Sequence, residues 1–230
     1  QFDDIALHYR EDGDPDGAPL VFANSLGTDL RIWDQVVARL PSGLRIIRFD
    51  KRGHGLSDVP AAPYSMGALV KDTERLLDLL EVRDCVLVGL SIGGMIAQGL
   101  AVKRMDLMRG EVLADATMER WFSRDFLARP ELGLGRNMLT RQPDAGYAGC
   151  SAAISGTDFY TPTSGLRLPT LGIAGSEDGS TPPDMVRETV GLIPGSRFEL
   201  IRGAGHIPCV EKPDAYADLL TGFLREIGHI

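Results

Sequence analysis

The chain has 230 residues, of which 43% are hydrophobic and 24% are charged, and its formal net charge at pH 7 is −8. This length accommodates a single domain with a substantial core, and the composition is that of an ordinary globular protein. The acidic excess argues against nucleic acid and against an anionic membrane surface as partners. The three cysteines have neither the even number of a disulfide framework nor the spacing of a zinc site, so we expect no metal and a reducing, cytoplasmic location.

The N-terminal residues, 1–4, lack the basic and apolar regions of a signal peptide. The longest apolar stretch, 86–102, is interrupted by Ser91, Gln98 and four glycines. Such a stretch is typical of a buried strand followed by a helix rather than of a membrane span.

Strand and helix patterns alternate through the first hundred residues. After an antiparallel edge strand over 5–9, apolar strand runs occupy 19–23, 45–49 and 86–90. Apolar residues recur at helical spacing over 30–40 and 66–80. This alternation predicts an α/β fold with a mostly parallel sheet covered by helices on both faces.

The most informative segment is Val-Leu-Val-Gly-Leu-Ser-Ile-Gly-Gly at 86–94. Ser91 lies between Gly89 and Gly93 where a strand turns sharply into a helix, in the spacing Gly-x-Ser-x-Gly. A strained backbone in such a turn holds the hydroxyl above the sheet, and side chains at the two glycines would collide with the neighbouring strand and helix. A glycine-rich turn without chemistry is the alternative. The strand before and the helix after favour Ser91 as a nucleophile.

A serine nucleophile needs a base and an acid, here in the chain order Ser, Asp, His. The apolar strand 169–175 runs into a turn-rich loop that carries Asp178, and the strand 197–202 runs into a loop that carries His206. We therefore expect His206 to be the base and Asp178 to orient it.

Other residues compete for these two roles. Glu177 is adjacent to Asp178, and Asp115 would follow an intervening strand, but the Asp-Gly pair turns the chain at Asp178. His54 also follows a strand. It precedes the serine and has no carboxylate loop to orient it, so we expect a structural role in a turn. The remaining histidines lie in the N-terminal strand and the terminal tail, without a strand-end loop: His8 and His229.

Acyl transfer also needs two backbone N–H groups aimed at the developing oxyanion. Ile92, the residue after the serine, supplies one candidate. Leu26 supplies the other, because it lies in the Asn-Ser-Leu-Gly-Thr loop that follows the strand 19–23. A simple turn is the alternative interpretation of this loop.

Residues 117–161 carry no strand signal and predict short helices over 118–128, 135–140 and 145–154. We expect them to form a small cap over the site. The chain would then divide into a core and a cap, with these bounds: 1–114 and 162–230 for the core, 115–161 for the cap.

The cap is where substrate choice is expected. Its arginines, among them Arg120 and Arg124, would help admit an anionic substrate, with solvated helix faces as the alternative. Trp121 is the candidate for an apolar wall facing the serine, with packing inside the cap as its alternative.

These motifs together resemble the α/β-hydrolase superfamily. The shared strings are Asn24-Ser25-Leu26-Gly27, Arg52-Gly53-His54-Gly55-x-Ser57, the Ser91 turn and Gly205-His206. Within the superfamily the chain resembles 3-oxoadipate enol-lactonases, through residues 24–28, 49–55, 89–95 and Arg-Trp-Phe at 120–122. Esterases and cofactor-free haloperoxidases share most of these strings.

The resemblance implies a serine hydrolase that opens 3-oxoadipate enol-lactone to 3-oxoadipate, a step of the β-ketoadipate pathway of aromatic catabolism, with no metal or organic cofactor. The partner would be a small anionic lactone, with no nucleic acid and no membrane, and the protein a monomer or homo-oligomer. The alternatives are a general carboxylesterase or perhydrolase and, in another class, a non-catalytic protein that binds a small molecule.

One departure from the superfamily lies after the nucleophile helix, where a further apolar strand usually precedes the cap. Here Gly110 passes at once to Glu111. Either 111–114 is that strand in shortened form, or a segment is absent between residues 110 and 111. The helix-forming composition of 113–121 favours the absent segment.

Overall fold

The computed structural model describes residues 4–114 and 121–230, which form one seven-stranded sheet in the order β1-β3-β2-β4-β5-β6-β7. Only β1 runs antiparallel to its neighbour, and the other five pairings are parallel. The predicted mostly parallel sheet is confirmed. The strands are β1 (Tyr9–Gly13), β2 (Ala18–Ala23), β3 (Leu44–Phe49), β4 (Cys85–Leu90), β5 (Met108–Ala114), β6 (Thr170–Gly175) and β7 (Arg197–Ile201).

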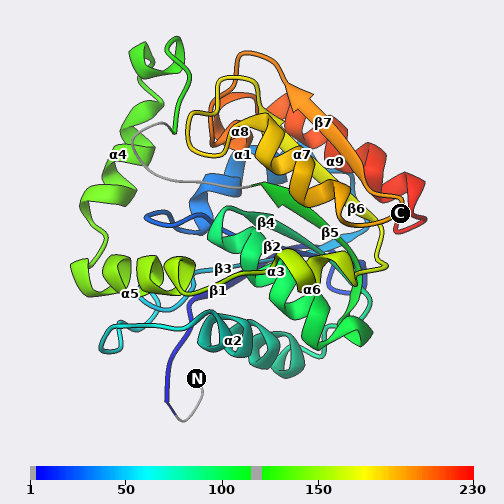
Figure 1. The fold of residues 1–230 in the computed structure, drawn as a ribbon, viewed down its shortest axis with the longest axis horizontal. Coiled ribbons are helices and arrows are strands. Elements are labelled where there is room, and N and C mark those ends of the chain that lie inside the picture. The colour runs from blue at the N-terminus through cyan, green and yellow to red at the C-terminus, as the bar shows by residue number, and fades with distance from the viewer. Residues whose placement is uncertain (1–3, 115–120) are drawn as a thin grey trace.

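Helices connect these strands and cover both faces of the sheet (Figure 1). The 3₁₀ helices are η1 (Leu30–Trp33), η2 (Met105–Leu107) and η4 (Phe126–Ala128). The α-helices are α1 (Asp34–Val37), α2 (Met66–Leu79), α3 (Ile92–Lys103), α4 (Leu132–Thr140), α5 (Asp144–Ser155), α6 (Tyr160–Ser164), α7 (Pro183–Gly191), α8 (Pro208–Glu211) and α9 (Pro213–Glu226). No helix in the described part of the chain combines the length and the apolar character needed to cross a lipid bilayer.

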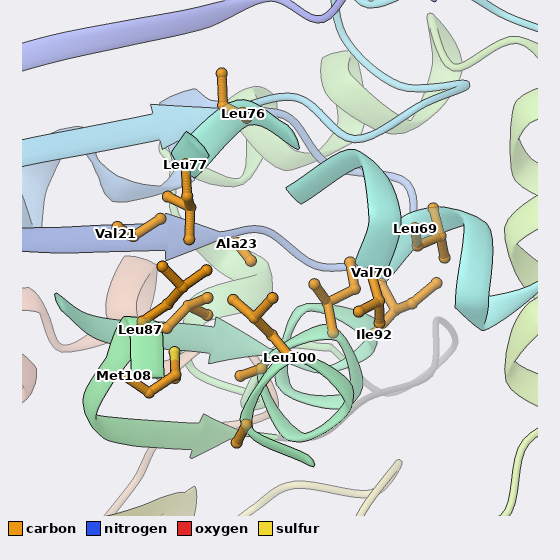
Figure 2. Packing of buried hydrophobic residues seen from close by; sticks show 14 of the residues in the cluster. Val21, Ala23, Leu69, Val70, Leu76, Leu77, Leu87, Ile92, Leu100 and Met108 are labelled. Atoms are coloured by element: carbon orange, nitrogen blue, oxygen red, sulfur yellow. The ribbon is translucent and has the colours of Figure 1, made fainter. Parts of the chain in front are cut away.

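Alternate residues of each central strand enter two separate apolar clusters. Every residue of β4 is buried, as expected of a parallel strand covered on both faces. Val21 and Leu87 face α2 and α3, where they pack with Leu77 and Leu100 (Figure 2). On the opposite face Phe22 packs beside Trp33, at 4.8 Å between ring centroids, in a cluster that includes residues of α9.

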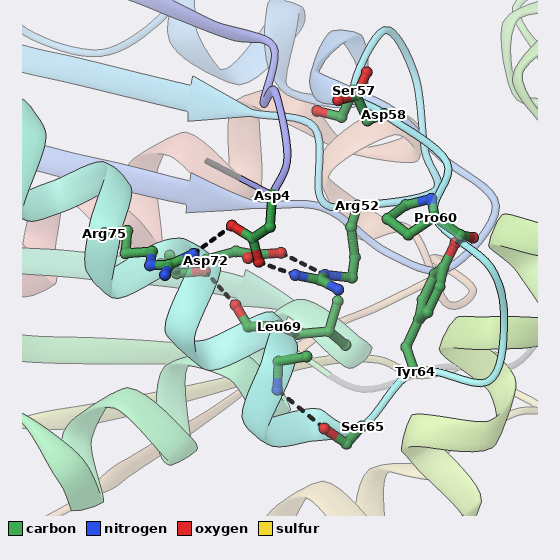
Figure 3. Close-up of polar contacts among 12 residues, drawn as sticks. Asp4, Arg52, Ser57, Asp58, Pro60, Tyr64, Ser65, Leu69, Asp72 and Arg75 are labelled. Atoms are coloured by element: carbon green, nitrogen blue, oxygen red, sulfur yellow. Dashed lines mark hydrogen bonds and ion pairs between the residues drawn. The ribbon is translucent and has the colours of Figure 1, made fainter. Parts of the chain in front are cut away.

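The segment between β3 and α2 is fastened to the core by polar contacts. The Arg52 guanidinium pairs with the buried Asp72 carboxylate of α2 at 2.6 Å (Figure 3). The Tyr64 hydroxyl donates to the Pro60 carbonyl, and Ser65 caps α2 by accepting the Ala68 N–H. This segment carries Lys51 and His54, whose positions it therefore fixes.

The edge strand begins later than its sequence predicts. Residues 5–9 were expected to pair, but the Ala6 N–H donates to the Asp58 carboxylate and the His8 N–H to the Ser57 hydroxyl. The ladder with β3 starts at Tyr9. These N–H groups, which a longer edge strand would have used for pairing, thus donate to side chains about fifty residues away.

The helix predicted over 30–40 is divided. The Asp29 carboxylate accepts the Arg31 N–H and starts the 3₁₀ helix η1, and α1 follows for four residues. Beyond α1 the N–H groups of Arg39 and Leu40 make tight turn bonds to the third residue before them. The helical pattern was therefore recognised, but not its tighter winding.

Residues 111–114 lie in β5, which pairs with β4 on one side and β6 on the other. The shortened strand is therefore observed, whereas the absence of a segment between residues 110 and 111 stays a prediction. The helix that the composition of 113–121 predicts is not formed at residues 113 and 114, which are strand, or at residue 121, and residues 115–120 lie outside the described part.

The segment that follows residue 120 is only partly helical, because residues 121–125 form a loop and turn where a helix was predicted. Of the expected helix over 118–128, residues 126–128 form η4 while 118–120 lie outside the described residues; α4 and α5 cover the other two expected helices. Figure 1 shows α4 and α5 along the left side of the view, beside the sheet. The Tyr64 N–H donates to the Gly149 carbonyl, so α5 lies against the loop that follows β3.

Candidate active site

Ser91 occupies the sharp turn between β4 and α3. Its φ of 64° and ψ of −125° are unusual for a residue with a side chain. Such a conformation costs on the order of 1–3 kcal/mol and is typical of functional turns. The residue is 2% exposed, and its Oγ has no hydrogen-bond partner among the described residues. The structure therefore shows no hydrogen bond between the Ser91 Oγ and the His206 Nε2.

The two glycines around Ser91 are required by close backbone approaches. A Cβ added at Gly89 would lie 2.3 Å from the Gly93 carbonyl oxygen, and one at Gly93 would lie 2.1 Å from the Ala23 carbonyl oxygen. Both distances are far below van der Waals contact, as the motif predicted. Gly93 therefore lets α3 approach β2 closely, and Gly89 lets β4 approach the first turn of α3.

We expect Gly93→Ala to lower the free energy of unfolding by about 1–3 kcal/mol, because a backbone carbonyl must move to admit the methyl group. It should also impair activity, since the displaced Ala23 carbonyl begins the 24–28 loop. Gly222→Ala in α9 is the matched control: its methyl meets nothing within 4 Å. The control should gain about 0.5–1 kcal/mol from helix propensity. Urea unfolding of both variants measures this, and equal stabilities would contradict the close approach.

Asp178 and His206 meet at the same edge of the sheet, after β6 and β7. The Asp178 Oδ2 lies 2.8 Å from the His206 Nδ1, and both side chains are buried. The Asp178 Oδ1 accepts the N–H groups of Ser180 and Thr181 at 2.8 and 3.0 Å. Because these donors fix the carboxylate as an acceptor, His206 carries its proton on Nδ1 and leaves Nε2 able to accept another.

The His206 Nε2 has no hydrogen-bond partner in the part of the chain that the structure describes. Ser91 follows β4, and β4, β6 and β7 run parallel, so all three side chains lie at the carboxyl edge of the sheet. Of the competing carboxylates, Glu177 is exposed and Asp115 lies outside the described residues.

The other histidines make structural contacts. His54 is buried, and its Nε2 accepts the Gly27 N–H at 2.9 Å. Burial and the nearby Lys51 lower the pKa of His54 well below its usual value, so the ring is neutral near pH 7. The His8 Nδ1 contacts the Asp50 carboxylate, and the His229 Nε2 contacts the Pro19 carbonyl.

The 24–28 loop is held in a fixed conformation. The Ser25 carbonyl accepts the Thr28 N–H and hydroxyl, and the Asn24 amide donates to the Thr28 carbonyl. Within the described residues the Leu26 N–H has no acceptor. Ile92 is the first residue of α3, and the N–H groups of a first helical turn lack intrahelical acceptors. Both N–H groups are thus available to an external oxyanion.

A buried carboxylate that sequence analysis did not single out joins the start of the cap to the histidine loop. Glu211 accepts the Gly205 N–H at 2.8 Å and the Ser123 N–H at 3.1 Å, and it also binds the Ser123 hydroxyl. Burial raises the pKa of Glu211 despite these donors. Ser123 lies 88 residues before Glu211, so no local pattern could have indicated that contact.

The three predicted substrate contacts differ in their surroundings. Trp121 is buried, and its carbonyl accepts the His206 N–H at 2.8 Å. The Trp121 side chain lines a cavity of about 210 Å³ together with Phe122, Leu127, Leu132, Gly135, Arg136 and Leu139. Arg124 is exposed, and Arg120 lies outside the described residues.

Comparison with known proteins places this geometry among hydrolases. 3-oxoadipate enol-lactonase 2 of Acinetobacter baylyi is 31% identical over 252 aligned positions, which include 96% of this chain and 94% of the relative. The alignment is longer than the 230 residues of this chain, so some of its positions are gaps in this chain. At those positions the relative has residues that this chain lacks.

Two solved structures are closely similar. The enol-lactonase from Burkholderia xenovorans LB400 has a TM-score of 0.91 at 30% identity, covering 97% of this chain and 98% of its own. A thermophilic esterase from Thermogutta terrifontis has a TM-score of 0.90 at 25% identity, covering 97% and 94% of the two chains. Residues 20–219 match the alpha/beta hydrolase family, and with these relatives the match shows that the chain belongs to that family.

Proposed function

We propose that this chain is a serine hydrolase that opens 3-oxoadipate enol-lactone to 3-oxoadipate. One observation carries the catalytic part of the proposal: the Asp178–His206 pair, 2.8 Å apart, follows two strands parallel to the one that ends at Ser91. The strained Ser91 backbone supports the same assignment. The substrate is inferred from the relatives, two of which are named as enol-lactonases.

In the proposed mechanism His206 takes the proton of Ser91 as the hydroxyl oxygen attacks the lactone carbonyl. Asp178 holds the imidazole ring and stabilises its charged form. The oxyanion that develops is stabilised by the N–H groups of Leu26 and Ile92.

Collapse of the tetrahedral intermediate breaks the ring C–O bond and leaves an acyl-enzyme on Ser91. The leaving group is an enolate, whose delocalised charge makes this step easy. His206 returns the proton it took from Ser91 to the enolate, which yields the ketone and leaves the imidazole neutral. A water molecule activated by His206 then releases the acid and restores Ser91. The cap residues Trp121, Arg120 and Arg124 are the proposed contacts of the lactone ring and of its carboxylate.

Turnover of freshly generated 3-oxoadipate enol-lactone, with a short neutral ester assayed alongside, tests the substrate. We expect rapid loss of the lactone and slow cleavage of the ester. Treatment with a fluorophosphonate, which reacts with activated serines, should abolish both activities.

Rapid ester cleavage with an inert lactone would replace the lactonase by a general carboxylesterase, the activity named for the Thermogutta relative. Absence of both activities and of labelling at Ser91 would favour a non-catalytic binding protein.

A further inference from the structure

Lys51 is a buried lysine behind the 24–28 loop. It is 2% exposed, and its Nζ donates to the Ser25 carbonyl at 2.6 Å and to the Asn24 carbonyl at 3.3 Å. It lies two residues after the end of β3, in the segment fastened by the Arg52–Asp72 pair (Figure 3). The ammonium group therefore meets the backbone of the loop from inside the protein.

The charge of Lys51 has no carboxylate partner within residues 4–114 and 121–230 at ion-pair distance. Its hydrogen-bond partners are backbone carbonyls, and the Asp50 and Asp29 carboxylates act on its charge only from beyond ion-pair distance. Burying an ammonium in this way is unfavourable for folding, and a neutral side chain of similar shape would be less costly. Stabilisation of the fold therefore does not account for a buried Lys51 ammonium. A role of the ammonium in the function of the 24–28 loop does account for it.

The peptide unit that Lys51 contacts is the one that carries the Leu26 N–H. In a planar trans peptide the C=O of one residue and the N–H of the next point in opposite directions. A cation on the Ser25 carbonyl therefore lies behind the Leu26 N–H, fixes the plane of the peptide and draws electrons away from the donor. Hydrogen bonds in such a chain strengthen one another, most of all in a buried site.

We propose that Lys51 is a positioning residue that orients and polarises the Ser25–Leu26 peptide as an oxyanion donor. This inference rests on the proposed serine hydrolase function, although it does not depend on which ester or lactone is the substrate. Three donors converge on the Ser25 carbonyl: the Lys51 ammonium, the Thr28 N–H and the Thr28 hydroxyl.

The charge state of Lys51 is set by its surroundings. Burial lowers its pKa to about 8, and Cys150, Asp50 and Asp29 oppose this shift. His54 also faces it and is neutral, while burial raises the pKa of Cys150 to about 11. Lys51 is therefore expected to lose its charge as the pH rises from about 7 to 9.5, and the polarisation of the peptide with it.

A purely structural role and the proposed one have opposite pH signatures. The folded pKa of about 8 lies below the ordinary value of 10.5, so the buried charge destabilises the fold at pH 7. This penalty fades as the pH rises from about 8 towards 10.5. The contribution of Lys51 to the free energy of unfolding thus becomes more favourable with rising pH, whereas its support of the oxyanion should decline.

The test is the second-order rate constant for the reaction of a fluorophosphonate with Ser91. This reaction builds negative charge on a phosphoryl oxygen, as ester cleavage does on a carbonyl oxygen, and it needs no substrate. Removing a whole oxyanion donor costs about 10²–10³-fold in rate, so losing only its support in Lys51→Met should cost roughly 10- to 50-fold at pH 7. The matched control is Lys71→Met, which changes an exposed lysine of α2 and should react like the wild type.

The pH profiles of the wild type and of Lys51→Met provide a second measurement. The wild-type rate should fall between pH 7 and 9.5 while unfolding shows the protein intact, and the Lys51→Met rate should lack this fall. A wild-type rate that stays level or rises across this range overturns the role of Lys51 but leaves the serine hydrolase assignment standing. A folded wild type that does not react with the probe at all refutes both.

Discussion

Replacing Ser91 by alanine is expected to reduce kcat by about 10⁶-fold, and Asp178→Asn by about 10⁴-fold. The second effect follows from the hydrogen bonds of the carboxylate. Oδ1 accepts two backbone N–H groups, so an asparagine keeps its oxygen there and turns its NH₂ towards the His206 Nδ1. The imidazole must then carry its proton on Nε2, where it cannot accept the proton of Ser91.

Steady-state kinetics on the best substrate would measure both losses. The double variant should be no slower than Ser91→Ala, because the residues act as one unit. Glu177→Gln, at the exposed neighbouring carboxylate, is the control and should keep full activity. An Asp178→Asn enzyme within tenfold of the wild type would mean that another acid orients His206.

The parts of the site that could be predicted from the sequence are those determined by local chemistry. Gly89 and Gly93 stand where a Cβ would strike a carbonyl oxygen, and this backbone requirement is readable as a motif. Asp178 and His206 follow short apolar strands in loops rich in turn residues, so their place at the sheet edge could be inferred. The helix α2 was indicated by its apolar spacing, and Ser65 caps its first turn.

The parts that could not be predicted depend on contacts between distant segments. The edge strand begins at Tyr9 because Asp58 and Ser57, about fifty residues away, take the preceding N–H groups. Lysine and glutamate are usually exposed, so a sequence predicts them at the surface. The residues around Lys51 and Glu211 do not indicate that these side chains are buried against the backbone of another loop. Such contacts exist only once the chain has folded.

Glu111 is the buried residue with the largest expected effect on stability. It lies in β5 opposite Leu87 and Thr170, is fully buried, and neither carboxylate oxygen has a hydrogen-bond partner in the described part of the chain. The Thr170 hydroxyl donates to the Leu168 carbonyl instead. Burial raises the pKa of Glu111 to about 8.

We expect the free energy of unfolding to fall as the pH rises from about 4.5 to 8. Over this range the unfolded chain releases the Glu111 proton while the folded chain retains it, so the fold loses stability with rising pH. A difference of about 3.5 pKa units corresponds to roughly 5 kcal/mol, an upper value because a buried site relaxes around a charge. Above pH 8 both states are ionised and the penalty is constant.

Urea unfolding of the wild type and of Glu111→Leu at pH 5, 6.5 and 8 would isolate this contribution. His54 acts in the opposite direction, since its lowered pKa costs stability as the pH falls, but its effect is the same in both proteins and cancels in their difference. Glu111→Leu should gain several kcal/mol over the wild type at pH 8 and far less at pH 5, whereas Glu188→Leu, at an exposed glutamate of α7, should show no such trend. A wild type as stable as Glu111→Leu at pH 8 would mean that the Glu111 carboxylate reaches water or a donor. A gain of the expected size would show that the buried Glu111 carboxylate destabilises the folded sheet at β5.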